Sequence, residues 1–170
     1  MSTLSDRDYI NKLEKAIIDY IVLKLNGDIY STVTAGFPNF TDKLPLDKVH
    51  ITVCCDDSTI TASGYDDAIS SENGEKLRAK IVEAPVSIDV WTSRGIPTNY
   101  SKSGGKTGCN KYFSNIASLF TIDESSFYDM YPDADIIEFR HQYVNEPDSA
   151  DAADIYQSHG QLTISFPFDI

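Results

Sequence analysis

Three short segments in which apolar and polar residues alternate constrain the fold of this chain most strongly. They are KVHITVCC (48–55), VSIDVW (86–91) and QLTISFPF (161–168). Successive side chains of a strand point to opposite faces of a sheet, so a period of two predicts half-buried strands. In the second segment the period places Val86, Ile88 and Val90 inward and Ser87, Asp89 and Trp91 outward. Residues 30–40 (YSTVTAGFPNF) and 136–144 predict two further strands.

A different spacing predicts two helices. In residues 6–25, apolar residues recur at steps of three and four and form one helix face, which ends at Asn26-Gly27. Its apolar members are Ile10, Leu13, Ile17, Ile21 and Leu25. The same spacing from Cys109 to Phe120 predicts a second helix of about three turns, with Thr107 or Ser103 as its N-cap.

The order of these elements is α-β-β-β-α-β-β, which predicts an α+β fold. We expect a mostly antiparallel sheet of about five strands, with the helices packed on one face. A length of 170 residues with 41% hydrophobic residues suits one domain, spanning residues 1–170. Residues 62–78 and 145–157 are polar, and we interpret them as long connections. Trp91 is expected on the face opposite Val90, covering a helix or a neighbouring subunit.

The charge limits the classes of partner. The net charge is −12, and nearly all of the excess lies after Thr121, where Arg140 is the one base. Proteins that grip nucleic acid do so through Lys and Arg, so such a groove is not expected. The acidic excess predicts either a solvated face or a surface past which DNA moves without binding. The sequence contains no run of about 20 apolar residues and no signal-peptide pattern, which predicts a protein folded in a cytoplasm without a membrane segment.

The stretch SKSGGKTGC (101–109) raises the question of a phosphate-binding loop. The full pattern requires a glycine five positions before Gly-Lys-Thr, and Tyr100 occupies that position. We therefore interpret the segment as a glycine-rich connection into the second helix. A nucleotide-binding enzyme that uses residues 104–107 remains the alternative.

Other candidate chemistry is incomplete. The three histidines, His50, His141 and His159, lie in or beside predicted strands, and the chain has no G-x-S-x-G turn to complete a hydrolase triad. The three cysteines, two of them adjacent, lack a C-x-x-C spacing and are interpreted as reduced structural thiols. Acidic residues at 148, 151 and 154 step by three and lack the EF-hand spacing. No catalytic, cofactor or metal site is predicted, which favours a binding or structural role.

The element order and three phrases resemble the tail terminator proteins of tailed bacteriophages. The phrases are LNGDIY (25–30) at the end of the first helix, VSIDVWTSRG (86–95) in the central strand, and SHGQLTISF (158–166) in the last strand. The resemblance spans nearly the whole chain. In its terms, residues 86–91 are the central strand, 106–121 the following helix, and 160–168 the final strand.

The resemblance implies a structural virion protein of the neck, assembled in the host cytoplasm. Such proteins form a ring, typically a homo-hexamer, that caps the tail tube, meets the head connector or stopper protein, and lets DNA pass without specific binding. The lumen or interface candidates are acidic: Asp148, Asp151, Asp154, Asp66 and Asp67. A monomeric adaptor of unknown ligand is the remaining alternative.

Overall fold

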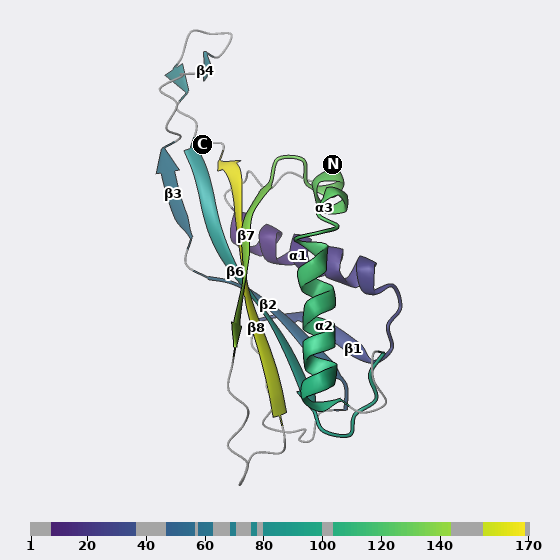
Figure 1. Ribbon diagram of the computed structural model, residues 1–170. Helices are drawn as coiled ribbons and strands as arrows, with labels where there is room; N and C mark the ends of the chain where they lie inside the picture. The colour runs from purple at the N-terminus through teal and green to yellow at the C-terminus, as the bar shows by residue number, and fades with distance from the viewer. Residues whose placement is uncertain are drawn as a thin grey trace.

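The computed structural model describes residues 8–36, 47–56, 58–62, 69–70, 76–77, 80–99, 104–143 and 155–168 (Figure 1). Three helices and eight strands follow one another along these residues. Their order is α1 (Tyr9–Leu25), β1 (Ser31–Ala35), β2 (Val49–Cys55), β3 (Thr59–Ala62), β4 (Ile69–Ser70), β5 (Lys76–Leu77), β6 (Lys80–Ser93), α2 (Gly105–Leu119), α3 (Ser125–Met130), β7 (Asp135–Tyr143) and β8 (Ile155–Phe168). The predicted α+β class is confirmed.

Six of the strands form one mixed sheet. Its order is β1-β2-β6-β8-β7, with β3 paired to the first part of β6, and β4 and β5 form a separate two-stranded sheet. The β1–β2 pair is parallel and the other pairs of the large sheet are antiparallel. The mostly antiparallel arrangement was predicted, but the count of about five strands was wrong. The missed strands β3, β4 and β5 are two to four residues long, too short to show a period.

Strand β6 is the centre of the sheet and is much longer than the predicted 86–91 segment. It pairs with β8 along its whole length, while β3 and then β2 pair with its other side. Pro85 lies between these two partners, and its carbonyl accepts a hydrogen bond from the Asp56 backbone N–H at 2.9 Å. The N–H and C=O of one strand residue point to the same side of the strand. At residue 85 that side faces the gap between β2 and β3, so the N–H that proline lacks has no strand partner to bond there.

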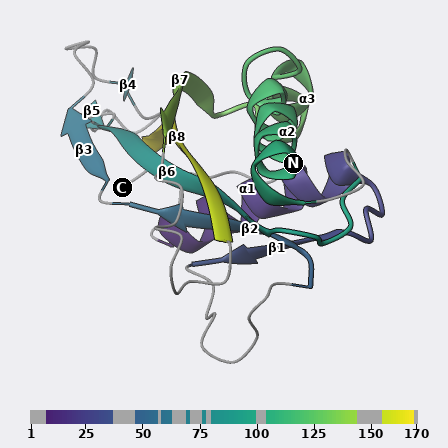
Figure 2. The ribbon, with the colours of Figure 1, turned by 60° about the horizontal axis from the view of Figure 1, so that its bottom comes forward.

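All three helices lie on one face of the sheet, as predicted (Figures 1 and 2). Helix α1 crosses β1 and β2, and α2 runs along β6 and β8. Apolar side chains from both helices and from alternate strand positions form one continuous core. The inward predictions for β6 are confirmed, because Val86, Ile88 and Val90 are all buried.

Helix α1 has the predicted apolar face and the predicted end. Its buried residues are Leu13, Ala16, Ile17, Tyr20 and Ile21. Asn26 adopts a left-handed conformation with φ 37°, and its N–H donates to the Val22 carbonyl. Gly27 follows with φ 77°, a conformation that glycine adopts at little cost, so the Asn-Gly pair ends the helix. Residues 6 and 7 of the predicted helix lie outside the described residues.

Helix α2 spans four turns rather than three and is followed by the unpredicted α3. The N-cap of α2 is Gly104, so the prediction of Thr107 or Ser103 was wrong. Helix α3 has six residues and is held by aromatic contacts: the rings of Tyr20, Phe120 and Phe127 meet edge to face with centroids 5.4–5.8 Å apart. The Tyr20 hydroxyl, 3.3 Å from the Leu119 carbonyl and 3.2 Å from the Asp123 carbonyl, ties α1 to the turn between α2 and α3.

Candidate functional site

The sequence GGKT (104–107) begins α2, where packing requires the first glycine and a positive φ favours the second. The Gly104 N–H donates to the Ile96 carbonyl at 2.7 Å. A Cβ atom at this position would lie 2.4 Å from the Ser93 carbonyl oxygen, which is impossible without a backbone shift. Gly105 has φ 61°, and its carbonyl accepts the Thr92 hydroxyl at 2.8 Å. The glycines therefore let α2 start directly against the end of β6.

Lys106 and Thr107 lie in the first turn of α2 and are exposed. Residues 100–103, which would form the rest of a phosphate-binding loop, lie outside the described residues. Within the described part, the glycines that suggested a phosphate loop are explained by contacts to the strand that precedes them.

The sheet face opposite the helices carries polar side chains. We call it the polar face and define it by the described strand residues that point away from the helices. They are Thr32, Thr34, His50, Thr52, Cys54, Thr59, Ile81, Glu83, Pro85, Ser87, Asp89, Trp91, Ser93, Asp135, Glu138, Arg140, Ile155, Gln157, His159, Gln161, Thr163, Ser165 and Pro167. Hydroxyl and amide groups dominate this set. Arg140 is its one Lys or Arg, and its Nε lies 2.8 Å from the Glu138 carboxylate.

Asp89 is the centre of the polar face. Its Oδ1 accepts a hydrogen bond from Gln157 Nε2 at 2.7 Å and lies 2.8 Å from His159 Nδ1. The register places Asp89 between Thr52 on β2 and His159 on β8. Asp89 is only 3% exposed, so this carboxylate depends on its partners in place of water.

Three residues of β6, namely Ser87, Asp89 and Trp91, were predicted to face outward, and the direction was right but the implied exposure was wrong. Ser87 and Asp89 point away from the helices, yet both are buried, as is Thr52. Trp91 lies on the face opposite Val90, as predicted, and its indole N–H donates to the Thr52 hydroxyl at 3.1 Å. It is half-buried on the helix-free face. The expectation that Trp91 covers a helix was therefore wrong, and the alternative, that it covers a neighbouring subunit, stays a prediction.

The thiols are poor nucleophiles at neutral pH because all three pKa values are raised. Burial, followed by the charges of Glu14 and Asp56, raises the pKa of Cys55 to about 12. Burial also raises the pKa of Cys54 and of Cys109. The Cys109 thiol donates to the Val90 carbonyl at 3.1 Å in the core. All three cysteines are free thiols, which agrees with their predicted structural role.

The histidines lie in three different strands. Burial lowers the pKa of His50 in β2. The His141 ring in β7 packs on the Phe113 ring with centroids 4.6 Å apart. His159 in β8 faces Asp89. His159 and Asp89 correspond to the base and the carboxylate of a hydrolytic triad, which also needs a nucleophile. The described cysteines are protonated, and the Ser87 hydroxyl donates to Asp56 at 2.6 Å, so neither supplies that nucleophile.

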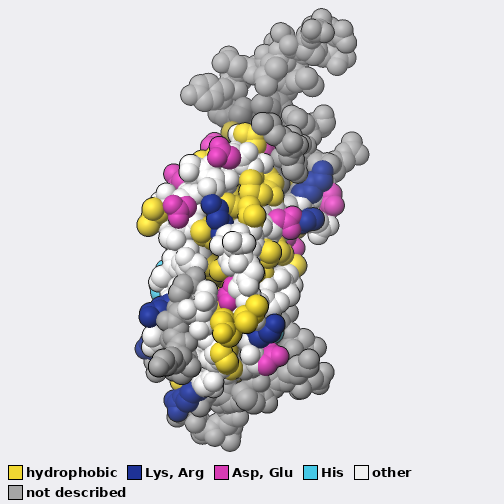
Figure 3. Space-filling view, turned by 90° about the vertical axis from the view of Figure 1, so that its right-hand side faces the viewer, with side chains coloured by type: hydrophobic (Ala, Val, Ile, Leu, Met, Phe, Trp, Pro, Cys, Tyr) yellow, Lys and Arg dark blue, Asp and Glu magenta, His cyan; other side chains and the backbone are white. Residues whose placement is uncertain are grey.

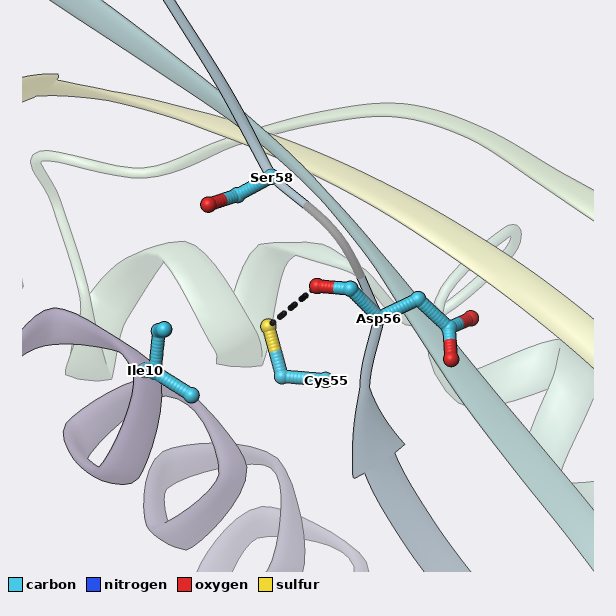
Figure 4. A pocket seen from close by; sticks show the side chains of 4 residues that line it. All are labelled: Ile10, Cys55, Asp56 and Ser58. Atoms are coloured by element: carbon cyan, nitrogen blue, oxygen red, sulfur yellow. Dashed lines mark hydrogen bonds between the residues drawn. The ribbon is translucent and has the colours of Figure 1, made fainter.

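A depression of about 600 Å³ lies between the start of α1 and the junction of β2 and β3 (Figure 4). It is lined by Ile10, Cys55, Asp56 and Ser58. The Cys55 sulfur points towards Ile10 and bonds the Asp56 carbonyl at 3.6 Å, whereas the Asp56 carboxylate points away from Ile10. The thiol is protonated, the carboxylate is directed elsewhere and the Ser58 hydroxyl bonds the Tyr9 hydroxyl, so the described lining places no base beside a nucleophile.

The predicted lumen or interface residues Asp148, Asp151, Asp154, Asp66 and Asp67 lie outside the described residues, so their positions stay a prediction. Among the described residues, no cluster of three His, Cys, Asp or Glu side chains could hold a metal ion. No helix in the same part of the chain is long and apolar enough to cross a membrane. Compared with protein-family models and with curated protein sequences, the chain matches none.

Proposed function

We propose that this protein is a structural virion component of the tail-terminator kind, which forms a ring at the head-proximal end of a tail tube and lets DNA pass into the tail. The observation that carries the proposal is the polar face of the sheet. Its described residues offer hydroxyl and amide groups, four carboxylates (Glu83, Asp89, Asp135 and Glu138) and the ion-paired Arg140.

Such a face suits a surface past which DNA must move. Proteins that hold DNA neutralise phosphates with Lys and Arg, and the release of counterions supplies most of the non-specific affinity. A face whose one guanidinium is already paired with a carboxylate supplies almost none of this affinity. In the proposed ring the polar face lines the channel and the three helices face outward, so DNA meets a surface that does not retain it.

The helix layer suits the outer surface of a ring for a related reason. Subunits of a ring contact one another head to tail, and each subunit uses two different surfaces for this. A single sheet covered on one side leaves the helix layer and the sheet edges available for neighbours, for the tail tube protein and for the head connector.

Imaging of virus particles tests the proposal. In particles that carry the protein with a density label at its C-terminus, we expect the label as a ring at the junction of head and tail. In preparations made without the protein, we expect heads and tails that do not join. Label on the capsid or at the distal tail tip, or joined particles formed without the protein, would refute the proposal.

A further inference from the structure

The two most exposed large hydrophobic side chains of the described residues lie towards opposite ends of α2. Ile122, 78% exposed, lies in the turn after α2. Ile29, 70% exposed, follows Asp28, whose carboxylate bonds the Tyr112 hydroxyl at 2.5 Å. The same hydroxyl accepts the N–H of Asn99 at 3.2 Å, in the segment that leads into α2. Single exposed apolar side chains are common on protein surfaces, so the charges around these two isoleucines decide whether they suit a contact.

Charges of opposite sign accompany the two isoleucines. We call Ile122 with Asp123, Glu124 and Asp129 the α3 end. Two bases lie nearby: Lys15, whose charge is balanced by Asp19, and Lys24, whose amine donates to Ser126 Oγ at 2.9 Å. Three carboxylates against the amine of Lys24 leave the α3 end acidic.

We call Ile29 with Arg94, Lys106 and Lys111 the α2-start end. Helix α2 contains two lysines and no acidic residue. The Arg94 guanidinium donates to the Tyr156 hydroxyl at 3.2 Å, and the Tyr156 ring lies against Gly105, so Arg94 belongs to the same end. Figure 3 shows the helix side of the molecule, where both signs of charge occur throughout, with more of the acidic side chains in the upper part and more Lys and Arg in the lower part.

We propose that copies of this chain associate head to tail, with the α3 end of one copy packed on the α2-start end of the next. The inference deepens the proposed function, on which it rests, by naming the contact between ring subunits. Along α2, Lys106 lies about 20 Å and Lys111 about 12 Å before Leu119, so one copy can use both ends at once.

We infer that a second copy of this chain binds here because the acidic α3 end and the basic α2-start end are complementary in charge. A chain with net charge −12 repels other copies of itself unless the few bases of one copy meet the carboxylates of another. The α2-start end gathers three of the 14 Lys and Arg residues of the chain. The helix dipole acts in the same sense, since it adds positive charge at the start of α2 and negative charge at its end. Ile29 and Ile122 supply the apolar contact that the charges orient.

A charge-swap experiment on the full-length protein tests this contact. The first variant combines Asp123→Lys with Asp129→Lys, and the second combines Lys106→Glu with Lys111→Glu. Each variant alone brings like charges together, so its association constant in sedimentation equilibrium should fall at least about tenfold. An equimolar mixture restores opposite charges at every contact and should recover association close to that of the unchanged protein.

Three controls accompany the swap. Glu83→Lys reverses an exposed charge on the polar face, away from both ends, and should leave association unchanged. Ile122→Ser removes the apolar contact and should weaken association without altering circular dichroism. Association of the unchanged protein should weaken between about 0.1 M and 1 M salt, as the Debye length falls from about 10 Å to about 3 Å.

Several outcomes would overturn the contact: an unchanged protein that stays monomeric at every concentration, an assembly that stops at the dimer, or a mixture that fails to recover. These outcomes are separate from the test of the proposed function. If the protein lies at the neck of particles and the swap fails, only this contact is wrong. If the swap succeeds and the protein is absent from the neck, the chain assembles head to tail for another purpose.

Discussion

Gly104 lies so close to Ser93 that a Cβ atom at residue 104 would stand 2.4 Å from the Ser93 carbonyl oxygen. The same Cβ would lie 2.6 Å from Ile96 Cγ1. This contact joins the end of the central strand to the start of α2, the two elements that the sequence GGKT connects. It assigns the first glycine a packing role, and a substitution there should report on stability.

We expect Gly104→Ala to lower the free energy of unfolding by about 1 to 3 kcal/mol, because the added methyl group forces the start of α2 away from β6. Urea denaturation followed by circular dichroism measures the loss. The matched variant Thr107→Ala alters an exposed side chain in the same turn of α2 and should change stability by no more than about 0.5 kcal/mol. Equal stability of Gly104→Ala and the unchanged protein would contradict the packing role.

Lys106→Ala should leave folding and the joining of heads to tails intact, because in our proposal Lys106 holds no nucleotide and Arg94 and Lys111 remain at the α2-start end. The measurements are the joining of heads to tails and the binding of ATP by calorimetry. A loss of joining together with a loss of measurable ATP binding would instead support the nucleotide-binding alternative. If only self-association weakens, the effect belongs to the subunit contact proposed above.

Gly160→Ala should destabilise the protein by about 1 to 3 kcal/mol, because β8 lies directly beneath two aromatic rings. A Cβ at Gly160 would stand 2.7 Å from Phe139 Cζ and 2.8 Å from Phe113 Cζ. The neighbouring variant Gln161→Ala faces the other side of the sheet and should change stability by no more than about 0.5 kcal/mol. Phe139→Leu removes one of the clashing atoms and should recover part of the loss when combined with Gly160→Ala. Absence of any such coupling would show that the rings move aside freely.

Cys55 should resist alkylation in the folded protein. Its pKa is raised to about 12 from 9.0, so at pH 8 its thiolate fraction is lower by about three orders of magnitude. In a Cys54→Ser background, mass spectrometry should detect slow labelling of Cys55 by iodoacetamide in buffer and rapid labelling in urea. Rapid labelling of the folded protein would contradict the raised pKa.

The raised pKa of Cys55 also predicts that the free energy of unfolding depends on pH. Because the pKa is higher in the folded state, Cys55 contributes no pH dependence well below pH 9, where the thiol is protonated in both states. As the pH rises from 9 towards about 12, the unfolded chain loses this proton first, so the free energy of unfolding should fall. A Cys55→Ala variant should show a smaller fall over that interval than the unchanged protein.

The last prediction concerns three acidic residues outside the described part of the chain and their effect on DNA ejection. If Asp148, Asp151 and Asp154 rim the proposed channel, replacing all three with Lys should slow DNA ejection, most strongly at low salt, where screening is weakest. Ejection is measured by the fluorescence of a DNA dye at several salt concentrations. Normal kinetics at every salt concentration, with rings assembled, would place these carboxylates away from the channel.

Hydrophobic period alone located the elements whose burial is one-sided. Helix α1 ends at Asn26-Gly27 as predicted, and the apolar positions of β2, β6 and β8 face the core. The period predicts these elements because each must bury one face against the same core, so its apolar residues recur at a fixed spacing within a short stretch of sequence. The packing of all helices on one sheet face follows from the same patterns.

Tertiary structure decided what depends on neighbours distant in sequence. The sequence pattern predicts that Asp89 is an outward-facing, exposed strand residue. In the structure it is buried, and its hydrogen-bond partners Gln157 and His159 lie 68 and 70 positions further along the chain. Likewise, the GGKT sequence suggests a phosphate loop until Ser93 and Ile96 are placed beside Gly104. A period records which side of an element is apolar, but only the folded chain determines what covers the other side, because burial and hydrogen bonding there come from strand pairing.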